Sequence, residues 1–165
     1  MRGEAEALTR TRRTLVGVLL ALASLLAIAV PAAVAQDEAG SIVFHVPLSG
    51  GTTGDPDGQG QAVLRFNPAT GTLCYVVVVR GIGEPTEPAP NLGNAHIHGP
   101  LPATGIAVHL ESEFVQRGAA DVYMASDCVS VNALTLTAIL ANPSLFYVNV
   151  HTVAFAGGAI SGSLG

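Results

Sequence analysis

Three of the five histidines in this 165-residue chain lie in two short motifs, Ala95–Gly99 and Tyr147–Thr152. Both motifs have the pattern of β-strands, in which successive side chains point to opposite faces. His96 and His98 are therefore expected on one face, about 6.5–7 Å apart along the backbone. A neighbouring strand can bring His151 beside them. Three neutral imidazoles suit copper or zinc, with a fourth position for water or another ligand, so these three histidines are the candidate metal ligands.

The same histidines have a structural alternative. Buried histidines often act as neutral hydrogen-bond hubs, with each ring nitrogen bonded to a backbone carbonyl or a hydroxyl group. Asn149 and Thr152 are the expected partners in that case. The choice between metal site and structural hub depends on whether His151 reaches the face that carries His96 and His98.

Other candidate chemistry is weaker. His109 is expected to lie exposed beside Glu111, and His45 at the surface or behind the ligands. Asp55 and Asp57 stand in a glycine-rich loop and carry the oxygen ligands that calcium prefers, but the loop lacks the order of a known calcium motif. No Gly-x-Ser-x-Gly elbow occurs, and no catalytic residues are assigned.

The first 35 residues have the pattern of a cleaved export signal. Four arginines precede residue 14, the apolar run Leu15–Val30 follows, and the Ala33–Ala35 segment predicts cleavage after Ala35. The apolar run is short of the roughly 20 residues of a spanning helix, which disfavours a retained anchor. Arg12 and Arg13 resemble a twin-arginine signal, although an ordinary signal remains an alternative. We expect a leader over 1–35, a linker over 36–40 and one domain over 41–165.

Removal of the leader makes the chain strongly acidic. The mature part keeps Arg65, Arg80 and Arg117 against ten acidic residues, a formal net charge of −7, and it has no lysine. A chain without a basic patch does not hold a phosphate backbone, which argues against nucleic-acid partners. The same charge argues against binding to anionic membrane surfaces. The expected location is the periplasm, the cell wall or the medium.

The only cysteines are Cys74 and Cys128, an even count in a chain with an export signal. Oxidising compartments favour disulfides, so we predict that the two cysteines pair. The alternative is a pair of metal thiolates that act with the histidines. Zinc motifs usually bring cysteines close together in sequence, and these are 54 residues apart.

Short apolar and β-branched segments separated by turn residues dominate the mature chain. The segment 73–80 is almost wholly apolar, which predicts a central strand buried on both faces. Prolines in 84–90 predict a crossing between sheets, and Asn132 is expected to cap one short helix that ends before Pro143. The fold class is therefore all-β, an antiparallel Greek-key sandwich or barrel with one short helix. Strands are expected over 41–48, 61–66, 73–80, 95–98, 105–110, 146–152 and 159–164.

Four motifs in order resemble a CHRD domain, the chordin-type domain that also occurs alone in exported bacterial proteins. They are Gly71–Tyr75, Ala95–Gly99, Tyr147–Thr152 and Gly157–Ile160. The resemblance implies a β-sandwich with an immunoglobulin-like or superoxide-dismutase-like outline, a cysteine pair, and no established catalytic activity. The chain departs from the pattern at Ser161, where such domains commonly have an arginine.

Two functions follow as hypotheses. The favoured one is a noncatalytic exported binding or structural module, which presents the loops 84–94 and 99–104 to a protein or another envelope component. The alternative is a copper- or zinc-binding protein with a redox or metal-carrier role, in which His96, His98 and His151 are the ligands. Neither hypothesis makes the protein an enzyme.

Overall fold

The structure is a computed structural model that describes residues 40–87, 93–100, 105–118 and 121–165. The predicted leader, and all of the predicted linker except Gly40, lie outside the described residues. Among the residues described, no helix is both long and apolar enough to cross a membrane.

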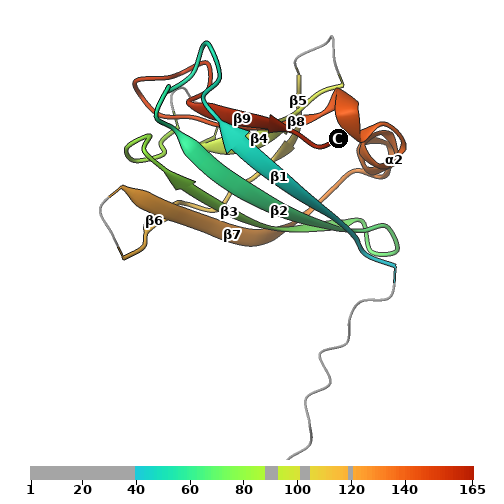
Figure 1. The fold of residues 1–165 in the computed structure, drawn as a ribbon. Helices are drawn as coiled ribbons and strands as arrows, with labels where there is room; N and C mark the ends of the chain where they lie inside the picture. Colours follow the sequence, from blue (N-terminus) through green and yellow to red (C-terminus); the bar gives the residue numbers. More distant parts are fainter. Residues whose placement is uncertain (1–39, 88–92, 101–104, 119–120) are drawn as a thin grey trace, which may run out of the picture. The chain divides into compact units, whose positions relative to one another are not determined.

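Within the described residues, nine strands form one antiparallel sheet, which curls into a half-barrel (Figure 1). The strand order is β5-β4-β8-β9-β1-β2-β3-β7-β6. One α-helix, α2, and one 3-10 turn, η1, join β7 to β8. The predicted all-β antiparallel class with one short helix is confirmed. The elements are β1 (Ile42–Ser49), β2 (Gln59–Asn67), β3 (Thr72–Arg80), β4 (Ala95–His98), β5 (Ile106–His109), β6 (Val115–Gln116), β7 (Val122–Ser130), α2 (Ala133–Ala141), η1 (Pro143–Leu145), β8 (Tyr147–Val150) and β9 (Ile160–Ser163).

The sheet has two parts that meet at a narrow seam. Strands β5, β4, β8 and β9 form one part, and β1, β2, β3, β7 and β6 form the other. Across the seam, β1 and β9 are paired at a single position, Ser49 opposite Ser161. Because β3 and β4 are consecutive in sequence but lie in different parts, the chain crosses after β3, although between two parts of one sheet and not between the separate sheets that were predicted.

The hydrophobic core fills the inner face of the curled sheet. On β2, for example, Ala62, Leu64 and Phe66 are all buried and alternate with more exposed residues. Helix α2 adds Leu136 and Ile139 to the same core. The helix begins as predicted, because the side chain of Asn132 accepts a hydrogen bond from the backbone N–H of Leu134 at 2.9 Å.

Strand β3 differs from the prediction. It lies between β2 and β7, but only one of its faces is buried. Val76 and Val78 point away from the core and are 40% and 38% exposed. The prediction of burial on both faces was therefore wrong: β-branched residues favour strands whether or not a second layer covers them.

The predicted disulfide is present between Cys74 and Cys128. The two residues are opposite one another in the β3–β7 pair, so the bond joins neighbouring strands. No cysteine is free, and both sulfurs are used in the bond. The alternative of two metal thiolates is thereby excluded in the oxidised chain.

Candidate metal centre

Strand β4 places two histidines on the side of the sheet that faces away from the core. Ala95 and Ile97 point inward and are buried in the core. By strand alternation His96 and His98 point to the opposite face, as predicted. His96 is nevertheless fully buried, and His98 is half-buried. The two imidazoles therefore lie in a covered region on the outer side of the sheet.

Strand β8 brings the third histidine to the same place. It pairs with β4 in an antiparallel register that sets Val150 opposite Ala95. The backbone N–H of His151, the next residue, donates to the carbonyl of Asn94 at 2.8 Å. This contact extends the ladder by one step, so His151 emerges on the outer face. Its side chain is 2% exposed.

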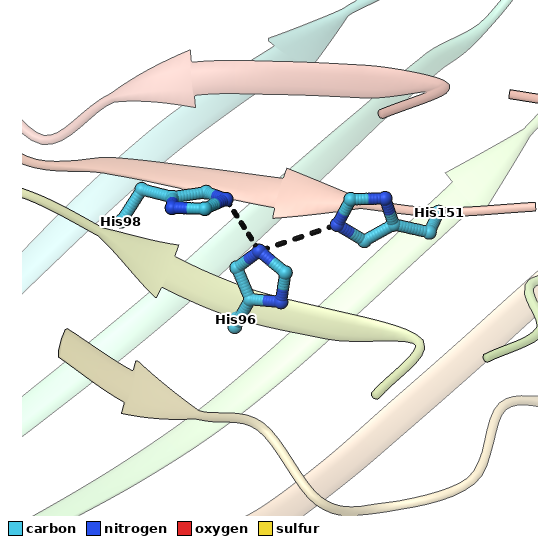
Figure 2. Close-up of side chains that lie close together, drawn as sticks. All are labelled: His96, His98 and His151. Atoms are coloured by element: carbon cyan, nitrogen blue, oxygen red, sulfur yellow. Dashed lines mark hydrogen bonds between the residues drawn. The ribbon is translucent and has the colours of Figure 1, made fainter. Parts of the chain in front are cut away.

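The three imidazoles converge on one point (Figure 2). The Nε2 atom of His96 lies 2.6 Å from Nε2 of His98 and 3.2 Å from Nε2 of His151. One ligand atom from each histidine lies within 4.8 Å of the other two. Metal–nitrogen bonds of 2.0–2.1 Å in a tetrahedral site place the nitrogens roughly 3.3 Å apart. The observed separations lie close to this value, so the cluster could hold one metal ion.

The backbone sets the ring tautomers in a way that favours a cation. Nδ1 of His151 lies 3.0 Å from the carbonyl oxygen of Ala156, and Nδ1 of His98 lies 3.3 Å from that of Gly105. A carbonyl only accepts, so each Nδ1 carries the proton and each neutral ring has a lone pair on Nε2. The Nε2 atom of His96 can carry at most one proton. It can therefore donate one hydrogen bond, although it lies close to the lone pairs of two other nitrogens. A metal ion at the centre would satisfy all three lone pairs.

Burial keeps His151 in the form that binds metals. Desolvation lowers the pKa of His151 below its ordinary value of 6.5; the hydrogen bond to Ala156 raises it by less, and the charge of His98 lowers it further. The neutral ring is favoured at neutral pH, and only the neutral ring coordinates a metal.

The same shift predicts how stability depends on pH in the metal-free protein. Because the native pKa of His151 is lowered, the unfolded chain binds more protons below pH 6.5. The free energy of unfolding is therefore expected to be highest above about pH 6.5 and to fall as the pH drops toward the native pKa of His151. Urea titrations in a chelator, across pH 7.5 to 5, measure this slope. The His151→Gln variant is expected to have a shallower slope, and equal slopes would contradict the assignment.

The loop 152–158 holds His151 from its outer side. The side-chain N–H of Asn149 donates to the carbonyl of Gly157 at 3.3 Å, and the hydroxyl of Thr152 accepts from the N–H of Phe155 at 3.2 Å. Asn149 and Thr152 thus anchor the loop, and the partner of His151 Nδ1 is a backbone carbonyl. The prediction that these two side chains bond to the histidine ring is wrong for His151 Nδ1.

A glycine is required where this loop returns to the sheet. Gly158 has φ of +124°, a region that L residues rarely adopt. A Cβ atom at Gly158 would also overlap the side-chain oxygen of Asn149. The glycine therefore lets the loop lie directly against the row of side chains that contains the histidines.

The remaining candidate residues lie outside the cluster. His45 is exposed on β1, in the other part of the sheet. His109 is exposed as predicted and lies opposite His96 on β5, with ring centroids 6.3 Å apart. Asp55 accepts a hydrogen bond from the backbone N–H of Asp57 at 3.2 Å, within its own loop. Within the described ranges, His96, His98 and His151 are the only group of three or more potential ligands close enough to share an ion.

A comparison with protein families identifies the domain. The profile of the CHRD domain matches residues 44–164. The chain belongs to the CHRD domain family. CHRD domains are extracellular, non-enzymatic binding modules, and the disulfide between β3 and β7 fits an exported protein. Neither a curated protein nor a solved structure matches the chain.

One departure from the CHRD pattern has a defined place in the structure, whereas the two predicted partner loops are described only in part. Ser161, where an arginine is common in such domains, is exposed on β9 and lies opposite both Ser49 and Asn149. The two loops predicted to meet a partner include residues 88–92 and 101–104, which lie outside the described residues.

Sequence reasoning missed one residue beside the histidine cluster. Tyr147 lies opposite His98 on β8, and the two rings are stacked with centroids 5.0 Å apart. The signal was available, because Tyr147, Asn149 and His151 are alternate residues of one strand and share a face. The register that sets Tyr147 against His98 was not available from the sequence.

Proposed function

We propose that this CHRD domain is a noncatalytic, exported binding module whose ligand is one divalent transition-metal ion, Zn(II) or Cu(II). His96, His98 and His151 supply three Nε2 ligands, and a water or an exchangeable ligand takes the fourth position. The observation that carries the proposal is the convergence of three Nε2 atoms while backbone carbonyls hold the Nδ1 protons of two rings. The sequence had favoured a partner-binding module, and this geometry moves the metal hypothesis ahead of it.

The donor set supports these two metals over others. Imidazole is a borderline ligand that suits zinc and copper, whereas calcium and magnesium require oxygen ligands. Nitrogen sites generally bind Cu(II) more tightly than Zn(II). Backbone carbonyls that orient ligand histidines are the usual outer support of such sites. We therefore expect both metals to bind, with copper the tighter.

The experiment is a metal titration of protein purified after expression of the full chain and stripped with a chelator. Calorimetry is expected to give one Zn(II) or Cu(II) per chain with a submicromolar dissociation constant. At a free metal concentration of about 100 times that constant, the free energy of unfolding rises by about 2.7 kcal/mol. That rise corresponds to an increase in melting temperature of roughly 10 °C for a domain of this size.

Two variants make this titration decisive. The double variant His96→Ala/His98→Ala is expected to lose both the stoichiometric binding and the thermal shift. His45→Ala removes an exposed histidine from β1 and is expected to behave as wild type. If wild type and the double variant bind Zn(II) and Cu(II) equally, or if neither is stabilised by metal, the proposal is wrong.

A further inference from the structure

The three histidines of the cluster are not held equally. His96 and His151 are 0% and 2% exposed, whereas His98 is half-buried. His98 is also the last residue of β4, and the β4–β5 register shifts between Ile97 and His98. Two histidines therefore form an enclosed pair of donors, and the third stands at the solvent side of the cluster.

Besides its close approach to His96, the ring of His98 is oriented by a hydrogen bond and by an aromatic contact from outside the cluster. Its Nδ1 donates to the carbonyl of Gly105 at 3.3 Å, a longer contact than the 3.0 Å bond that holds His151. Its face stacks on the ring of Tyr147, with an angle of 22° between the ring planes. The tyrosine ring lies against the face of the imidazole and therefore opposes its rotation.

We propose that His98 is the ligand through which the metal enters and leaves, and that Tyr147 is the positioning residue that keeps His98 in place. This inference rests on the metal site proposed above. The buried pair, His96 and His151, retains its position while the ring of His98 turns away and opens the cluster to solvent. Tyr147 opposes that rotation through its ring face, so it slows metal release without touching the ion.

The proposed role of Tyr147 depends on its aromatic ring and not on its hydroxyl group, and two substitutions test the two parts separately. Tyr147→Leu removes the aromatic face and keeps apolar bulk, whereas Tyr147→Phe keeps the face and removes the hydroxyl. Loss of a partner that orients a metal ligand typically weakens a site by 10- to 100-fold. We therefore expect Tyr147→Leu to release metal about tenfold faster than wild type. Tyr147→Phe is expected to stay within about twofold.

The experiment uses the Zn(II)- and Cu(II)-loaded proteins. Stopped-flow transfer of the metal to excess EDTA measures the release rate. Electron paramagnetic resonance of the Cu(II) forms measures how many nitrogens are bound, and Tyr147→Leu is expected to shift the spectrum toward two strongly bound nitrogens. Tyr123→Leu is the matched control, because Tyr123 is a half-buried tyrosine of β7 in the other part of the sheet.

Each outcome has a defined meaning. If wild type binds metal and Tyr147→Leu has the same release rate and spectrum as wild type, this inference is wrong and the proposed function still stands. Equal acceleration in Tyr147→Phe and Tyr147→Leu would assign the effect to the hydroxyl and also overturn it. If Tyr123→Leu releases metal as fast as Tyr147→Leu, the effect comes from a general loss of stability, and the inference is also wrong. Absence of binding in wild type would overturn the proposed function itself.

Discussion

Replacement of His96 by glutamine is expected to weaken Zn(II) and Cu(II) binding by about 100-fold or more, the largest loss from any single ligand. Both close contacts in the cluster end on its Nε2 atom, at 2.6 Å from His98 and 3.2 Å from His151. Loss of that atom leaves two donors, and two imidazoles do not complete a zinc or copper site that normally has at least three protein ligands. Competition with a chromophoric chelator measures the dissociation constants.

The control for this prediction must separate lost coordination from lost structure. Glutamine preserves much of the volume of the buried ring, and the melting temperature of the metal-free variant reports any remaining damage. His45→Gln makes the same substitution at an exposed position on β1. A dissociation constant for His96→Gln within threefold of wild type would show that His96 is not a ligand.

Removal of the Cys74–Cys128 bond is expected to lower the free energy of unfolding by about 4 kcal/mol. The bond closes a loop with a sequence separation of 54, and the chain-entropy relation gives this magnitude for such a loop. Cys74 is half-buried and Cys128 is exposed, so serine at both positions fits without a new cavity. The loss is a large share of the 5–15 kcal/mol that stabilises a typical domain.

Urea unfolding of the Cys74→Ser/Cys128→Ser variant measures this difference. The chain has no tryptophan, so far-ultraviolet circular dichroism is the suitable signal. The folded variant is expected to bind metal as wild type does, because neither sulfur is a ligand. A loss of stability below about 1 kcal/mol would contradict the prediction. It would indicate that the unfolded chain keeps β3 and β7 close together even without the disulfide.

Most of the strands were predictable because their signals are local. Alternation and turn residues located seven strands, and Asn132 and Pro143 marked the two ends of the helical region. Strands β6 and β7 were missed, since β6 has only two residues and the β7 segment Val122–Ser130 mixes small and polar residues on both faces. The exposed face of β3 was also beyond prediction, because an apolar strand does not reveal which of its sides another layer covers.

The candidate site was predictable in part for the same reason. Strand periodicity alone places His96 and His98 on one face. The approach of His151 depends on the pairing of β4 with β8, and His151 is 55 residues from His96 in the chain. Sequence has no local signal for such a register. The carbonyls of Ala156 and Gly105, which set the tautomers, belong to loops whose paths depend on the finished fold.

The arrangement of β3, β4 and β8 makes the proposed metal site insensitive to the redox state of the chain. Cys74 lies between the buried residues Leu73 and Tyr75, so it points outward from one part of the sheet. His96 points outward from the other part, with the hydrophobic core between them. Thiols released by reduction would therefore stay out of reach of the ion. A reducing environment would loosen the fold without changing the ligands that the metal meets.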